Sequence, residues 1–361
     1  MGILIRNSCE STYSIRRFPC QVLLRLLLSA AALTAVLFNY REPVHAGELP
    51  ANVVQTDHQA YSYDEMREDI QTLCAKYPGL LSWQSIATTG QGREVLKVRL
   101  GNPAAPHRVM IQSAIHAREY MTSQLTMEII EYICDNYGSL ACNGIPYETL
   151  FNDTCFVILP MANPDGVMIS QQGAAGATMQ YTKDWLALVQ SLGGNPVQIK
   201  SNGSGVDINR NFAQGFGQGT PSRPTPWLYN YAGPSPLSES ETRALVDTAR
   251  SEGFSCHINY HSAGNAMYYG SVLSSAATLS RTVTLYQTLK GYNGYKVVPI
   301  KPTDKATGSF ADFVTAEFQR PTVTVEIGKK NPVPIGEFDG IFKKNRDTWG
   351  AVAFMLYMGM L

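Results

Sequence analysis

The stretch Ala114-Ile115-His116-Ala117-Arg118-Glu119-Tyr120 places an imidazole and a carboxylate three positions apart, directly after an apolar run. Val109-Met110-Ile111 is typical of the end of a buried strand, and residues 122–137 carry helical periodicity. His116 and Glu119 therefore fall on a strand-to-helix turn, and such turns lie at the rim of a sheet, where ligands bind. Zinc accepts histidine nitrogen and carboxylate oxygen, and a catalytic site has three protein ligands. A third ligand must come from elsewhere in the chain.

The remaining sequence alternates between strand-like and helical patterns, which indicates an α/β sheet. A first helical pattern runs from Tyr63 to Tyr77, and a helical piece is expected around Lys183 to Ser191 within a long, glycine-rich stretch from 171 to 219. The segment 336–361 is expected to form one terminal amphipathic helix that packs on the sheet through Trp349, Val352, Phe354, Met355 and Leu356. The strand-like runs are 81–88, 95–100, 109–115, 155–161, 254–261 and 322–327.

Length and composition limit the classes of protein that this chain can be. With 361 residues and 44% hydrophobic content, it can bury one large core or two ordinary ones. Its 29 basic and 29 acidic residues balance, so nothing points to nucleic acid as a partner.

The N-terminus has the pattern of an export signal. Three arginines precede an apolar run over 22–38, and Val44-His45-Ala46 has small residues where a signal peptidase reads them. We expect a signal peptide over 1–46, a short linker over 47–59 and a catalytic domain over 60–361, hence a secreted or cell-surface protein. The alternative is an uncleaved anchor, but the charge-free core over 26–38, interrupted only by Ser29 and Thr34, is shorter than the ~20 residues that span a bilayer.

Five cysteines follow the leader, namely Cys74, Cys134, Cys142, Cys155 and Cys256. Because five is odd, at least one thiol is unpaired, and a surface disulfide between Cys142 and Cys155 is one possibility that spacing cannot settle. The chain has no Cys-x-x-Cys pair, so a cysteine-ligated metal is not expected.

Candidate third ligands stand in the run Cys256-His257-Ile258-Asn259-Tyr260-His261-Ser262. The two histidines lie on one face of a strand but roughly 13 Å apart at strand rise, so only one of them can join the same ion. Structural histidines satisfied by the backbone are the simpler interpretation of either one taken alone.

Two further clusters carry groups that suit peptide hydrolysis. Arg210, in Asp207-Ile208-Asn209-Arg210-Asn211, can bind a carboxylate in bidentate fashion with Asn209 as an amide donor beside it, although such a run also occurs as a loop cap. In the strand Thr322 to Ile327, Glu326 lies on the face opposite the valines, where it is either an exposed carboxylate or a general base that passes a proton to the leaving amine.

Taken together, these residues resemble the zinc carboxypeptidases of the carboxypeptidase A type, and features after Glu326 resemble the bacterial branch. The family pattern runs in order through His-x-x-Glu, Asn-Pro-Asp-Gly, Asp-x-Asn-Arg-Asn, His-Ser and a catalytic Glu. It is matched here by His116 to Glu119, Asn163 to Gly166, Asp207 to Asn211, His261-Ser262 and Glu326.

The resemblance implies an α/β fold with a mixed, largely parallel twisted sheet flanked by helices on both faces. It implies one Zn²⁺ per chain held by His116, Glu119 and His261, with Glu326 as the catalytic residue. It also implies that Asn209 and Arg210 bind the substrate carboxylate and that Arg118 contacts a subsite. One position departs from the pattern, since Lys200 stands nearest to the family's oxyanion-stabilising arginine. Asp312 lies in a segment that aligns with the family's specificity pocket, where it either meets a basic or amino-bearing substrate side chain or pairs with a strand or loop amide.

We therefore expect a secreted, monomeric zinc metallocarboxypeptidase that hydrolyses the C-terminal peptide bond of peptides, with no stable membrane contact after the leader is removed. Its partner would be a peptide or muropeptide with a free C-terminal carboxylate. The alternative within enzymes is a γ-D-glutamyl-diaminopimelate cell-wall peptide hydrolase. The alternative of another class is a non-catalytic carboxylate-binding module.

Overall fold

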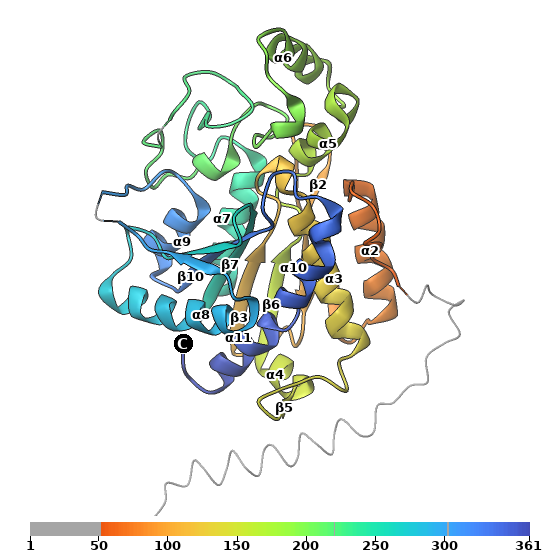
Figure 1. The fold of residues 1–361 in the computed structure, drawn as a ribbon, viewed down its shortest axis with the longest axis vertical. Coiled ribbons are helices and arrows are strands. Elements are labelled where there is room, and N and C mark those ends of the chain that lie inside the picture. Colours follow the sequence, from red (N-terminus) through yellow and green to blue (C-terminus); the bar gives the residue numbers. More distant parts are fainter. Residues whose placement is uncertain (1–51, 220, 302) are drawn as a thin grey trace, which may run out of the picture. The chain divides into compact units, whose positions relative to one another are not determined.

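A mixed sheet of eight strands forms the centre of the protein in a computed structural model that describes residues 52–219, 221–301 and 303–361 (Figure 1). The strand order is β1-β2-β6-β3-β7-β10-β8-β9. The β6–β3, β3–β7, β7–β10 and β8–β9 neighbours are parallel and the other neighbours antiparallel, which confirms the predicted sheet. The strands are β1 (Leu81–Thr88), β2 (Glu94–Leu100), β3 (His107–Gln112), β6 (Thr154–Leu159), β7 (Cys256–Ser262), β8 (Ala266–Tyr269), β9 (Lys296–Val298) and β10 (Thr322–Ile327).

The central strands are buried on both faces, which explains why they read as apolar runs rather than as clean alternations. Every residue of β6 and of β7 is buried. Alternate side chains of β7 enter different cores: Cys256, Ile258 and Tyr260 face one cluster, while His257, Asn259 and His261 face the other side.

Helices cover both faces of the sheet, as predicted (Figure 1). The larger core lies under α2 (Tyr63–Lys76), α3 (Met121–Asp135), α4 (Tyr147–Asp153), α8 (Ala276–Asn293), α10 (Phe338–Asn345) and α11 (Thr348–Tyr357). The second core lies under α7 (Ser240–Glu252) and α9 (Phe310–Phe318), whereas α5 (Pro164–Gln172) and α6 (Gln180–Ser191) follow β6 at one end of the sheet. A separate short hairpin pairs β4 (Ala141–Cys142) with β5 (Ile145–Pro146).

The C-terminal segment differs from the prediction of one amphipathic helix. It forms α10 and α11, preceded by a 3-10 turn over Ile335–Glu337, because the chain bends at Arg346 and Asp347. The second of these helices is apolar on nearly all sides and is almost wholly buried. Its Trp349 stacks on Phe156 of β6, with ring centroids 5.5 Å apart, so packing on the sheet is as expected.

Residues 52–59, from the stretch expected to act as a linker, contact the sheet-bearing part directly. The amides of Val53 and Val54 donate to the two carboxylate oxygens of Glu131 at 2.7 and 2.8 Å, and both valines are buried. The predicted leader and its cleavage point lie outside the described residues. Among the residues that are described, no helix combines the length and the apolar character needed to cross a membrane.

The five cysteines of the described chain are all free thiols, so the possible Cys142–Cys155 disulfide is not formed. Cys155 is fully buried in a central strand, whereas Cys142 lies in the β4–β5 hairpin. Cys256 occupies a buried strand, as predicted.

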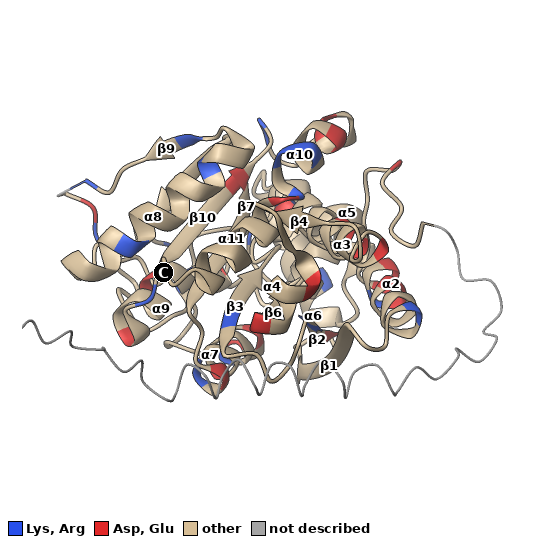
Figure 2. Ribbon diagram, turned by 90° about the horizontal axis from the view of Figure 1, so that it is seen from below, with Lys and Arg blue, Asp and Glu red and all other residues tan. Residues whose placement is uncertain are grey.

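Charged residues of both signs are spread over the outer helices, for example along α2 (Figure 2). One buried exception lies at the end of α7, where the Glu252 carboxylate pairs with Lys97 at 2.9 Å and also with Arg99 and Arg108. This cluster ties α7 to strands β2 and β3.

Candidate metal centre

The turn after β3 brings the first two candidate ligands to the edge of the sheet. The chain leaves the sheet after Gln112 and passes through Ala114, which has a left-handed φ of 48°. The Ala114 amide donates to Thr122 Oγ1 at 2.8 Å, which stabilises this strained backbone. His116 then precedes a 3-10 turn over Ala117–Glu119, so that both side chains point to one side.

The third candidate comes from the end of β7, the strand beside β3. Glu119 lies between two imidazoles: its Oε1 is 2.9 Å from His116 Nδ1, and its Oε2 is 3.0 Å from His261 Nδ1. The two Nδ1 atoms are 3.2 Å apart. All three side chains are buried, and the described residues contain no other group of three or more potential ligands with this geometry.

These separations fit a shared divalent cation. A tetrahedral zinc ion with Zn–N bonds of about 2.0–2.1 Å places neighbouring ligand atoms about 3.3 Å apart, close to the observed 2.9–3.2 Å. Two imidazole nitrogens and a carboxylate are also a donor set that zinc prefers. His116, Glu119 and His261 are therefore a suitable three-ligand zinc site.

The charge state of the carboxylate agrees with that assignment. Burial by itself raises the pKa of Glu119, but the two imidazoles oppose this effect and hold its pKa well below the usual range. Glu119 is therefore ionised. The amide of Ser262 donates to Glu119 Oε2 at 3.2 Å and orients it further.

The second histidine of β7 has a structural role instead. The ring of His257 lies among Phe254, Phe310 and Phe318, and burial lowers its pKa to about 3. Its distance from the cluster follows from strand rise, as the sequence predicted. His257 is thus an uncharged core residue.

Glu326 lies beside the cluster on β10. It is the register partner of His261 in the parallel β7–β10 pair, so both side chains project from the same face. Burial raises the pKa of Glu326 to about 7, while the charge of His261 opposes that rise. A carboxyl group with a pKa near neutrality can both accept and return a proton at physiological pH.

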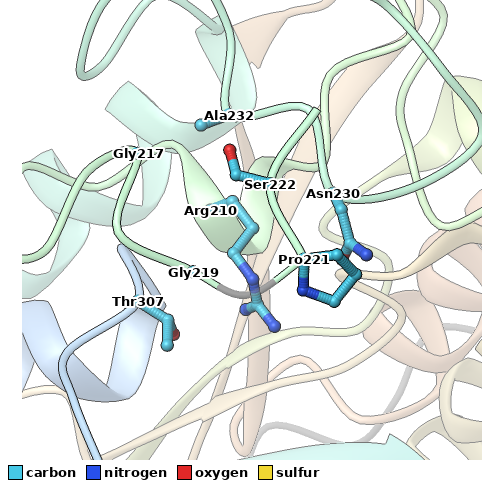
Figure 3. A pocket seen from close by; sticks show the side chains of 8 residues that line it. All are labelled: Arg210, Gly217, Gly219, Pro221, Ser222, Asn230, Ala232 and Thr307. Atoms are coloured by element: carbon cyan, nitrogen blue, oxygen red, sulfur yellow. The ribbon is translucent and has the colours of Figure 1, made fainter. Parts of the chain in front are cut away.

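Asn209 and Arg210 occupy a short 3-10 turn over Ile208–Arg210. The amide of Phe310 donates to Asn209 Oδ1 at 2.9 Å, which fixes the Asn209 side chain and leaves Nδ2 as a donor. Arg210 donates through Nη1 to the Asn209 carbonyl at 2.8 Å. Figure 3 shows its side chain between Pro221 and Thr307. A planar guanidinium next to an amide donor is suited to bind a carboxylate.

Arg118 and Lys200 lie on adjoining segments of the same region. The Arg118 amide donates to the Ile199 carbonyl at 2.9 Å, and the Ala117 amide donates to the Lys200 carbonyl at 3.3 Å. The positive charges of Lys200 and Arg118 both act on Glu326, which places the two side chains near the cluster. Their positions are compatible with substrate contact.

Asp312 caps the start of α9. Its Oδ2 accepts from Thr307 N at 2.8 Å and from Ser309 Oγ at 2.8 Å, within a capping box that begins α9. Its Oδ1 accepts from Ser271 Oγ. Because both oxygens are engaged, the geometry favours a capping role over contact with a substrate side chain.

Two residues without a predicted role also lie at the site. Asp207 Oδ1 lies 3.6 Å from His116 Nε2, which is too long for a hydrogen bond but places the carboxylate beside the outer nitrogen of this candidate ligand. Neither atom has a hydrogen-bond partner among the described residues. Asn163 Nδ2 donates to the Ile115 and Lys200 carbonyls, both at 3.2 Å. Each of the two residues lies in a motif that matches the family pattern, so the sequence contained a signal for both.

Comparison with known proteins gives the family of the chain. A family model described as zinc carboxypeptidase matches residues 66–346. The gamma-D-glutamyl-L-diamino acid endopeptidase 1 of Lysinibacillus sphaericus is 28% identical over 291 residues, which is 79% of this chain and 70% of the relative. Carboxypeptidase A2 of Mus musculus is 28% identical over 196 residues, but the match spans 54% of this chain and only 42% of that relative.

Solved structures show the same fold. The crystal structure of carboxypeptidase A from Helicoverpa armigera superposes with a TM-score of 0.61 at 20% identity, covering 92% of this chain and 79% of that one. At this identity the likeness concerns the fold alone. The match of the family model, which covers most of the chain, shows that the protein belongs to the zinc carboxypeptidase family.

Proposed function

We propose that this protein is an exported zinc-dependent carboxypeptidase that hydrolyses the C-terminal peptide bond of peptides. The observation that carries the proposal is the convergence of His116, Glu119 and His261, with Glu326 in register beside His261. Family membership supports the reaction class, and the leader predicted from the sequence over 1–46 supports export.

The residues divide the reaction between them. A zinc ion held by the two imidazoles and Glu119 would supply Lewis-acid polarisation of the scissile carbonyl. Glu326 takes a proton from the attacking water and returns it to the leaving amine, which its pKa of about 7 permits. Arg210 and the Asn209 amide hold the terminal carboxylate, so that the last peptide bond lies at the metal centre.

The matched histidines of β7 provide a test. His261→Gln and His257→Gln alter buried imidazoles on one strand, and only the first removes a proposed ligand. We expect the purified wild type to hold one zinc per chain and to cleave hippuryl dipeptides. His261→Gln should lose both properties, while His257→Gln should keep both with reduced stability. A wild type without zinc and without activity would support the non-catalytic binding module instead.

A second candidate is the hydrolysis of γ-D-glutamyl-diamino acid bonds in cell-wall peptides. The bacterial endopeptidase match favours it, because that alignment covers a larger share of both chains than the carboxypeptidase A2 match. The same metal centre and proton carrier serve either bond. Parallel assays on hippuryl dipeptides and on γ-D-glutamyl-diaminopimelate peptides separate the two, and cleavage of the latter alone would overturn the primary proposal.

A further inference from the structure

Ser262, which follows His261, has all three of its polar groups engaged around the metal centre. Its amide donates to Glu119 Oε2 at 3.2 Å. Its hydroxyl donates to Asn331 Oδ1, and its carbonyl accepts from Asn331 Nδ2 at 2.7 Å. Ser262, whose amide orients a candidate metal ligand, is thus held through its hydroxyl and its carbonyl by one asparagine side chain.

Asn331 is also connected to the substrate side of the site. Its backbone carbonyl accepts from Gln198 Nε2 at 3.2 Å. The Gln198 Oε1 atom in turn accepts from Arg118 Nη1 at 3.1 Å. One residue therefore joins the strand end that carries His261 to the segment that holds Arg118.

The loop that carries Asn331 is itself fixed at its far end. Gln59 Nε2 donates to the Val333 carbonyl at 2.8 Å, and the Ile335 amide donates to Gln59 Oε1 at 2.8 Å. Val333 is buried in the larger core. At its near end the loop continues from β10, the strand of Glu326. Asn331 is thus held in place by the surrounding chain, and its side-chain hydrogen bonds fix the position of Ser262.

We propose that Asn331 is a positioning residue for the metal centre, acting through Ser262 on Glu119 and on the end of β7. The inference rests on the proposed zinc site. Its physical basis is that groups which orient metal ligands raise metal affinity, and that their removal typically costs 10–100-fold. The side chain of Asn331 is suited to this role because it offers a donor and an acceptor to one residue at the same time.

The test compares zinc affinity in Asn331→Ala and Asn345→Ala. Asn345 is a matched control, because it is a buried asparagine whose Nδ2 makes two hydrogen bonds, to Tyr295 Oη at 3.1 Å and to the Ile341 carbonyl at 2.8 Å, within α10 and its packing. Each protein is stripped of metal and titrated with zinc against a chromophoric chelator. We expect the zinc Kd of Asn331→Ala to rise about 10–100-fold, while that of Asn345→Ala stays within twofold of wild type.

Thermal unfolding of the metal-free proteins separates positioning from general destabilisation, since both variants lose two side-chain hydrogen bonds but only one should lose metal affinity. Ser262→Ala provides a milder second variant, because it removes the hydroxyl contact and keeps the Asn331 Nδ2 bond to the carbonyl. Its zinc Kd should rise less, and adding Ser262→Ala to Asn331→Ala should have no further effect.

The outcomes distinguish the two proposals. A wild type that binds no zinc would overturn the proposed function, and this inference with it. Wild-type zinc binding together with an unchanged Kd in both Asn331→Ala and Ser262→Ala would overturn the inference alone.

Discussion

Gly308 controls the position of the proposed carboxylate-binding arginine, and Gly308→Ala tests this directly. The glycine has a left-handed φ of 78°, and a Cβ there would lie 2.5 Å from the Arg210 carbonyl oxygen. That is about 0.9 Å short of ordinary van der Waals contact at 3.4 Å, so the backbone of Arg210 or of Gly308 must move by nearly an ångström. A misplacement of about 1 Å in a substrate-positioning group can cost on the order of 100-fold in rate.

The matched control is Gly193→Ala. Gly193 has a similar φ of 83°, but a Cβ there meets nothing within 4 Å. Both variants incur the left-handed strain of about 1–2 kcal/mol, whereas only Gly308→Ala incurs about 1–3 kcal/mol more from the overlap. We expect kcat/KM on a hippuryl dipeptide to fall about 10–100-fold in Gly308→Ala with one zinc per chain retained, and to stay within twofold in Gly193→Ala.

Urea unfolding of both variants shows whether the extra overlap destabilises the fold as calculated. Equal kcat/KM values in the two variants would refute the reasoning, because a displacement of the Arg210 backbone would then have no effect on catalysis. Loss of zinc from Gly308→Ala would also refute it, since the effect would not be confined to the carboxylate-binding side.

Three more predictions concern charge and metal. Glu252→Gln leaves the buried Lys97 ammonium without its full counter-charge and should lower the free energy of unfolding, measured by urea titration, by about 3–5 kcal/mol. The control Glu317→Gln breaks an exposed ion pair and should lower the free energy of unfolding by less than about 1 kcal/mol in the same assay. Burial raises the pKa of Glu241 to about 7, so its folded form keeps a proton that the unfolded form loses near pH 4.5, and stability should fall as pH rises from about 4.5 to 7. Glu241→Gln should remove a difference on the order of 3 kcal/mol between those pH values, and parallel pH profiles for wild type and variant would contradict this. Dialysis against a chelator should abolish peptide hydrolysis, and one equivalent of zinc should restore it; full activity in the stripped protein would contradict the metal role.

The strands were predictable where a long apolar run decided them. β1 and β10 begin and end where the pattern placed them. β3 is shorter than the predicted run to residue 115, because Ala114 takes a left-handed φ and the chain has left the sheet. The short strands β8 and β9 depend on pairing with neighbours far away in the sequence, so four or three residues carry too little pattern to reveal them.

Site residues that lie close together in the sequence were easier to predict than those that meet only in the folded protein. His116 and Glu119 share one turn, so spacing alone made them a candidate pair. The choice of His261 over His257 needed the family pattern, because a strand places both on one face and only tertiary structure shows which one meets Glu119. The proposed role of Asn331 could not be predicted from the sequence, because it depends on the path of a loop that the sequence does not specify.

The three proposed ligands have one consequence for how the chain acquires metal. His116 and His261 are separated by 145 positions, and they meet only when β3 and β7 lie side by side. An unfolded chain therefore offers at most His116 and Glu119 as neighbouring ligands, and these two bind an ion much more weakly than all three ligands together. Uptake of the ion is thereby coupled to folding, and at a free concentration of one hundred times Kd it adds about 2.7 kcal/mol to the native state. The ambient supply of the ion, as well as the polypeptide itself, then determines how long the native protein survives.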